Sequence, residues 1–147
     1  MHRDGDWHRA AHVWIIGAGG RILLQRRSMK KENNPGLWDV SAAGHVSAGE
    51  TAIETAIRET EEELGLKLSP SELRPAGSIA ESCVLNGGRY IDREFHEIFV
   101  VRRDVDLQSL VLDPEEVAEV RWVDELHPDE TFVPHAREYA LLSRLAR

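Results

Sequence analysis

The sequence predicts a single α/β or α+β domain with mixed strand pairing, and three observations support this. Its 147 residues are the usual size of one domain, long enough to bury well over half of the surface of the unfolded chain. Short strand-like runs lie on both sides of one strongly periodic helical segment. No internal repeat, low-complexity tract or linker divides residues 1–147, so we expect one domain.

The N-terminal part predicts a hairpin followed by a polar loop. Residues 12–17 and 21–27 have the apolar content of strands, and the small residues Ala18–Gly20 between them indicate a turn. Residues 30–36 combine Lys, Asn, Pro and Gly, which is typical of a loop, and residues 37–46 predict a short strand punctuated by small residues.

A helix is predicted over residues 50–64, with Gly65 as its stop. Four apolar residues lie at helical spacing on one side of it: Ile53, Ala56, Ile57 and Leu64. Three further strands are predicted at residues 73–83, 95–102 and 117–123, separated by turns at 86–88 and 112–114. A terminal helix is expected to start near Pro134.

Composition and charge restrict the classes of function. The chain is 41% hydrophobic and 30% charged, and it contains neither an apolar run of membrane-spanning length nor an apolar secretory signal, so we expect a cytoplasmic protein that does not enter a membrane. A formal net charge of −8 argues against a nucleic acid polymer as partner, because that affinity comes from a basic surface. Cys83 is the single cysteine and has no partner for an internal disulfide.

Three glutamates define the predicted chemical site. Glu59, Glu62 and Glu63 share one helix face at spacings of three and four residues, opposite the apolar face. Carboxylates this close repel one another, and hard divalent cations such as Mg²⁺ bind oxygen ligands together with substrate phosphates. A metal platform is therefore one interpretation, and a solvated acidic face is the other.

The residues around these glutamates resemble the Nudix box, Gx5Ex7REUxEExGU, where U is apolar. The fixed positions of the box are matched by Gly44, Glu50, Arg58, Glu59, Glu62, Glu63 and Gly65, and Leu66 takes the last apolar position. Thr60 departs from the pattern at the middle apolar position. Seven fixed residues in a strand–loop–helix context make this a specific signal.

The resemblance implies a Nudix α/β/α sandwich with a mixed sheet and a loop–helix–loop that holds Mg²⁺ or Mn²⁺. By family analogy Glu59, Glu62 and Glu63 are metal ligands, Gly44 offers its backbone carbonyl, and Glu62 or Glu63 is also the candidate base. Arg58 is expected to orient a glutamate rather than touch substrate. Glu50 is expected to open the helix, where its charge favours the N-terminal dipole.

Three flanking segments resemble the subgroup of the family related to isopentenyl-diphosphate isomerase: Leu23–Ser28, Pro35–His45 and Phe132–His135. In those isomerases a catalytic cysteine directly precedes a Gly-His pair, and here that position is Ala43. The resemblance also matches four residues to metal ligands of the isomerases: His8, His45, Asp92 and Glu94. Because the thiol is missing, hydrolysis is favoured over isomerisation.

Several residues outside the box are candidates with equally plausible structural roles. Arg26 and Arg27 alternate on a predicted strand, so one of them can point toward substrate phosphates while the other remains a surface charge. Trp38 can stack on a substrate or, more commonly for such a residue, pack in the core. Glu115 and Glu116 are either a second metal or base site, like Asp92 and Glu94, or solvated loop acids.

The sequence therefore predicts metal-dependent hydrolysis of a diphosphate linkage in a small molecule, such as a nucleoside diphosphate derivative. Isopentenyl-diphosphate isomerase-like activity and a catalytically inactive nucleotide-binding module are the alternatives. The intact set of three glutamates speaks against the inactive module. A monomer and a homodimer are equally compatible with the sequence.

Overall fold

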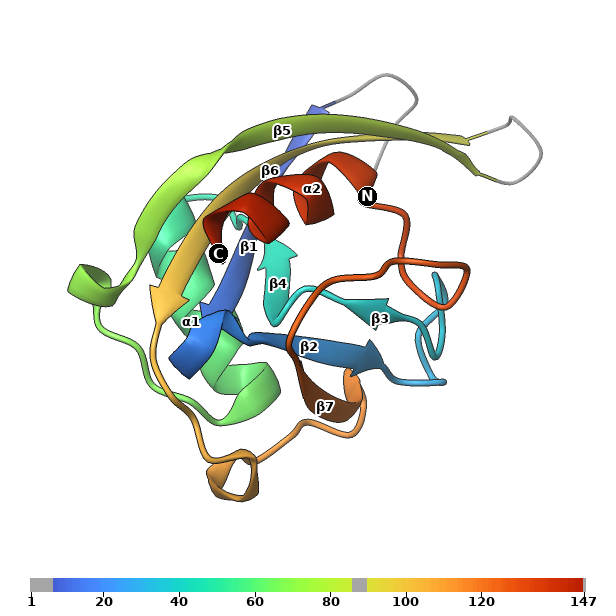
Figure 1. Ribbon diagram of the computed structural model, residues 1–147. Coiled ribbons are helices and arrows are strands. Elements are labelled where there is room, and N and C mark those ends of the chain that lie inside the picture. Colours follow the sequence, from blue (N-terminus) through green and yellow to red (C-terminus); the bar gives the residue numbers. More distant parts are fainter. Residues whose placement is uncertain (1–6, 86–89, 147) are drawn as a thin grey trace.

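The computed structural model describes residues 7–85 and 90–146, and its strands form one mixed sheet with a helix on each face (Figure 1). The strands are β1 (Trp7–Ile16), β2 (Ile22–Arg27), β3 (Trp38–Asp39), β4 (Ala42–His45), β5 (Arg74–Leu85), β6 (Tyr90–Arg102) and β7 (Val117–Val123). The helices are α1 (Ala52–Leu64) and α2 (Ala136–Leu145). The turn expected at residues 86–88 lies mostly outside the described residues.

Strand β1 organises the sheet. It pairs antiparallel with β2 and β4, and parallel with β6 from Trp7↔Arg93 to Ile16↔Arg102. β5 and β6 form a long antiparallel hairpin beyond it, while β7 and β3 pair with β2. The expected mixed pairing and the α/β/α arrangement are therefore confirmed.

Several strand boundaries differ from the predicted ones. β1 and β6 each begin five residues earlier than expected, at Trp7 and Tyr90. Residues 7–11 of β1 pair with residues 93–97 of β6, and residues 90–92 of β6 pair with residues 83–85 of β5. Such backbone pairing needs no apolar pattern. The single strand predicted at 37–46 is divided into β3 and β4 around the buried Ser41. The Ser41 hydroxyl donates to the Leu23 carbonyl at 2.6 Å and accepts from the Ile15 amide at 2.9 Å, which satisfies the backbone there.

Helix α1 begins two residues later than predicted. Thr51 is its N-cap and forms a capping box with Glu54, while Gly65 ends the helix in the left-handed conformation at φ 68°. Glu50 consequently precedes the cap and is not part of the first turn, where Glu54 supplies the acidic group. The expected dipole role of Glu50 is therefore wrong, and its side chain binds the Arg58 guanidinium instead.

The core has two halves because side chains on β1 alternate between the two faces of the sheet. Val13 and Ile15 pack on the side of α1, whereas Trp14 and Ile16 pack on the side of α2. Burying an aliphatic side chain of this size stabilises the fold by about 1.5–3 kcal/mol. Among the described residues, no helix is both long enough and apolar enough to cross a bilayer.

Candidate active site

A cavity of about 600 Å³ is lined by residues of α1, of several strands and of the segment before α2. One part of its wall carries the acidic residues Glu59, Glu63 and Glu116 together with Gly44, all of which were singled out in the sequence. Another part carries polar residues that the sequence analysis did not select: Gln25, Asp39, His12, His96, His135 and Glu81. The cavity therefore joins the box glutamates to a group of histidines.

Glu63 is held at the base of the acidic wall and is only 5% exposed. The Gln25 side-chain amide donates to Glu63 Oε1 at 2.9 Å and the Ala43 backbone amide does so at 3.3 Å. Burial, with a smaller contribution from the nearby Glu59 carboxylate, raises the pKa of Glu63 to about 8 against the lowering effect of the Gln25 hydrogen bond. Both donors are neutral, so this carboxylate is positioned without its charge being balanced.

Glu59 lies directly over Gly44. A Cβ atom on Gly44 would come within 2.3 Å of Glu59 Cγ and 2.5 Å of Glu59 Oε1, so only glycine leaves the carboxylate its place. Burial raises the pKa of Glu59, the Arg58 guanidinium opposes that shift, and the Glu62 carboxylate adds to it. Glu59 and Glu63 both line the cavity, whereas Glu62 is joined to Glu59 through Arg58.

Arg58 links the acidic residues of the box. Its guanidinium contacts Glu50 through two nitrogens at 2.8 and 3.0 Å, and it also reaches Glu59 at 3.1 Å and Glu62 at 3.2 Å. The two-point contact with Arg58 lowers the pKa of Glu50 to about 2. Arg58 does not line the cavity, and its contacts are those of a residue that orients glutamates. Glu62 also lies outside the lining, with a side chain that is 55% exposed.

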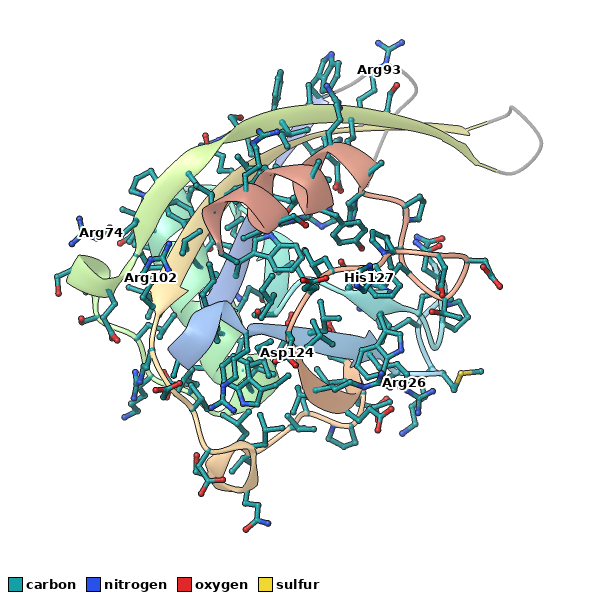
Figure 2. The ribbon with its side chains drawn as sticks, viewed as in Figure 1. Arg26, Arg74, Arg93, Arg102, Asp124 and His127 are labelled. Carbon is teal, nitrogen blue, oxygen red and sulfur yellow. The ribbon has the colours of Figure 1, made fainter. Side chains whose placement is uncertain are left out.

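The arginine pair on β2 is divided between the cavity and the surface. Arg27 lines the cavity and lies 3.4 Å from Asp39, whereas Arg26 pairs with Glu119 at the periphery of the molecule (Figure 2). Trp38 is 8% exposed, belongs to the core on the α2 side and does not line the cavity. Of the three residues expected to bind substrate, the structure brings only Arg27 to the cavity.

The two remaining acidic candidates, Glu115 and Glu116, lie in different surroundings. Glu116 lines the cavity and forms a 2.8 Å ion pair with Lys31, which lies on the same wall. Glu115 pairs with Lys30 on the exposed surface and is not part of the lining. Glu116 therefore remains a candidate on geometric grounds, and Glu115 is a solvated loop acid.

Two of the residues matched to the isomerase ligands, His45 and Glu94, line the cavity. His45 Nε2 lies 2.5 Å from Glu94, and His8 is opposite Glu94 in the register of β1 and β6. Burial raises the pKa of Glu94, but hydrogen bonds from His45 and His96 outweigh it and hold the pKa well below its usual range. Ala43 lines the cavity at the position of the isomerase cysteine. The side chains of Asp92 and Cys83 lie outside the described residues.

The histidine group was missed because its members come from distant segments. His12 is on β1, His96 on β6 and His135 directly before α2, and their rings contact one another at centroid distances of 4.0–5.4 Å. Burial lowers the pKa of His96 and His135, but the neighbouring carboxylates outweigh it and raise them to about 9 and about 10. The sequence did hold one signal: His12 is a buried polar residue directly before the apolar run of residues 13–16.

Comparison with known proteins agrees with the box geometry. The family described as NUDIX domain matches residues 6–141. Nudix hydrolase 3 of Arabidopsis thaliana is 44% identical over 84% of this chain, and an isopentenyl-diphosphate Delta-isomerase of Cutibacterium acnes is 36% identical over 79% of it. The structure of a MutT protein from Methanosarcina mazei Go1 superimposes with a TM-score of 0.75 at 22% identity, covering 99% of each chain, which shows a shared fold.

The chain spans only part of the curated relatives. It covers 16% of the Arabidopsis protein and 59% of the Cutibacterium protein, so the activities of those whole proteins are not transferred here. The family match extends over most of the chain and includes every fixed position of the box. On this evidence the chain belongs to the Nudix hydrolase family.

Proposed function

We propose that this protein is a metal-dependent hydrolase of a diphosphate linkage in a nucleoside diphosphate derivative or a related small organic diphosphate. The observation that carries the proposal is the pair Glu59 and Glu63, two carboxylates brought together in the wall of a substrate-sized cavity. Desolvation works against their charged forms, and a divalent cation at this wall would balance them.

The residues present fit a hard divalent cation such as Mg²⁺ or Mn²⁺. The missing Cβ of Gly44 leaves room for Glu59, and both carboxylates offer the oxygen ligands that such a cation prefers. Burial raises the pKa of Glu63, and a bound cation would act in the opposite direction. Glu59, Glu62 and Glu63, with the Gly44 carbonyl, would hold the ion. When bound, such an ion neutralises charge on phosphoryl oxygens and lowers the pKa of water.

The chain's own groups supply positioning and proton transfer. Arg58 fixes Glu59 and Glu62, while Gln25 fixes Glu63 from the opposite side. Glu62 and Glu63 are the candidate bases for the attacking water, because each can take one proton at a carboxylate oxygen. Arg27 and Lys31 provide positive charge in the cavity for substrate phosphates.

Glu62→Gln tests the metal platform. Glu62 is exposed, so the variant should fold normally, which circular dichroism would verify. Metal-dependent cleavage of the diphosphate, followed by chromatography of its phosphorylated products, should fall by at least about 100-fold. Glu61→Gln is the matched control on the same helix, at an exposed and variable position of the box, and it should retain the wild-type rate. An unchanged rate in Glu62→Gln would contradict the proposal.

The neighbouring arginines test where the substrate binds. Arg27→Ala should raise KM for the diphosphate about tenfold or more, since a phosphate contact inside the cavity is lost. Arg26→Ala should leave KM unchanged, because Arg26 pairs with Glu119 outside the cavity. An equal rise in KM in both variants would contradict a specific contact between Arg27 and the substrate phosphates.

Isomerisation of a prenyl diphosphate is the second candidate, favoured by the relatives that carry that name. Ala43 opposes it, because a methyl group cannot replace a thiol in proton transfer to carbon. A panel of nucleotide and prenyl diphosphates, assayed by chromatography for both diphosphate cleavage and alkene isomerisation with Mg²⁺ or Mn²⁺, separates these activities. Binding without any turnover would favour the inactive nucleotide-binding module.

The net charge of −8 supports a small-molecule substrate rather than a nucleic acid polymer, and we propose a cytoplasmic setting and a monomer or homodimer. Sedimentation of the purified chain would decide between the two oligomeric states. Proteins that bind a nucleic acid backbone usually present a basic surface to it. The carboxylates in the wall of this cavity would repel such a backbone.

A further inference from the structure

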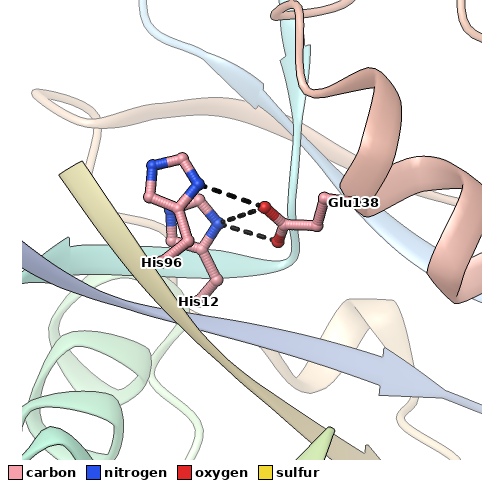
Figure 3. Close-up of side chains that lie close together, drawn as sticks. All are labelled: His12, His96 and Glu138. Atoms are coloured by element: carbon pink, nitrogen blue, oxygen red, sulfur yellow. Dashed lines mark hydrogen bonds and ion pairs between the residues drawn. The ribbon is translucent and has the colours of Figure 1, made fainter. Parts of the chain in front are cut away.

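A second group of potential metal ligands lies at the cavity wall and behind it, apart from the glutamates of the Nudix box. His12, His96 and Glu138 place one ligand atom each within 4.8 Å of one another, and all three residues are buried (Figure 3). Glu81 and His135 form another such triad with the same His96. His96 is therefore the member common to two sets of ligands drawn from β1, β5, β6, α2 and the segment before α2.

Glu138 is oriented before any ion arrives. Its Oε2 accepts a hydrogen bond from Trp14 Nε1 at 2.8 Å, and His12 Nδ1 lies 2.8 and 3.0 Å from its two oxygens. The carboxylate projects from α2 toward the sheet, with its other oxygen, Oε1, 3.3 Å from His96 Nδ1. The Trp14 hydrogen bond is an outer contact that fixes the direction of the carboxylate, which is a regular feature of metal sites.

The Nδ1 atom of His96 is buried and has no hydrogen-bond partner among the described residues. Its Nε2 lies 2.9 Å from Glu94 Oε1, so in the neutral ring Nε2 carries the hydrogen that this bond requires. Nδ1 then carries a lone pair, and this buried atom makes no hydrogen bond although Glu138 Oε1 faces it. A nitrogen lone pair and a carboxylate oxygen repel unless a cation lies between them, and that cation is either a proton or a metal ion.

We propose that His12, His96 and Glu138 form a binding site for a divalent first-row transition metal, represented by Zn²⁺. This site is distinct from the one proposed at the glutamates of the Nudix box. Two imidazoles and one carboxylate are a common zinc ligand set, whereas Mg²⁺ prefers oxygen ligands. Tetrahedral zinc with bonds of about 2.0–2.1 Å separates its ligand atoms by about 3.3 Å, close to the spacing from His96 Nδ1 to Glu138 Oε1.

An ion can reach this site from solvent. His12 and His96 both line the cavity, so the cavity that would admit a diphosphate also gives access to the triad. Glu138 closes the site from α2, and a bound ion would therefore join α2 to β1 and β6. Binding should raise the thermal stability of the protein, because the unfolded chain does not hold these three groups together.

Calorimetric titration of the metal-stripped chain with Zn²⁺, in saturating Mg²⁺ to occupy the glutamates, tests the proposal. We expect one equivalent of zinc per chain and a rise in the melting temperature. His96→Asn should lower the zinc affinity by at least about 100-fold, while Glu59→Gln should retain it. Absence of zinc binding by the wild-type chain under these conditions, or undiminished binding by folded His96→Asn, would overturn the proposal.

A matched histidine variant separates this site from the cavity rim. His45 contacts Glu94 from the exposed side and is not a member of either triad, so His45→Asn should bind zinc as the wild type does. Loss of zinc in His45→Asn would place the ion at the rim and overturn the assignment. Zinc-edge X-ray absorption of the wild-type protein should show imidazole scattering and needs no variant to fold, and a spectrum with oxygen ligands alone would also refute the site.

Discussion

Replacing Glu63 with Gln should stabilise the metal-free protein at alkaline pH. The pKa of Glu63 rises from 4.5 to about 8 on folding, so the folded state holds this proton more tightly than the unfolded state does. Stability attributable to this residue therefore falls as the pH rises from about 4.5 to about 8. The full shift corresponds to about 5 kcal/mol, and the part between pH 5 and pH 8 to about 3–4 kcal/mol.

Urea unfolding in EDTA at pH 5 and pH 8 measures this difference directly. The gap in unfolding free energy between Glu63→Gln and the wild type should widen by about 3 kcal/mol over that range, since glutamine keeps an oxygen to accept from Gln25 and has no charge to bury. Glu61→Gln, at an exposed position on the same helix, should show no such widening. A gap that does not change with pH would refute the argument that desolvation sets the pKa of Glu63.

Three other changes test the box and its supports. Gly44→Ala should displace Glu59 and lower metal-dependent turnover at least about tenfold, measured beside circular dichroism, and full activity would contradict the close approach of the two residues. Arg58→Lys should weaken Mg²⁺ binding about tenfold in a calorimetric titration, because the two-nitrogen contact with Glu50 is lost, and wild-type affinity would remove its orienting role. Thr51→Ala should cost about 1 kcal/mol of unfolding free energy with unchanged Mg²⁺ affinity, and unaltered stability would show that the cap is dispensable.

Local sequence patterns were sufficient to predict those helices and strands that depend on a few neighbouring residues. The helical spacing of the box predicted that Glu59, Glu62 and Glu63 would share a face, and Gly65 predicted the end of α1. The hairpin of β1 and β2 was equally readable from two apolar runs and a turn. The polar ends of β1 and β6 were not readable, because each is stabilised by the other across more than eighty residues of chain.

The sequence by itself determined the family and the acidic helix face, because the chemistry of the box is encoded at fixed spacing within one segment. Only the tertiary structure decided that Arg27 enters the cavity while Trp38 joins the core, since both depend on which face of the sheet is covered. It alone also assembled His12, His96 and Glu138, which come from β1, β6 and α2. Parallel pairing and the packing of α2 bring these groups together, and no local spacing records such contacts.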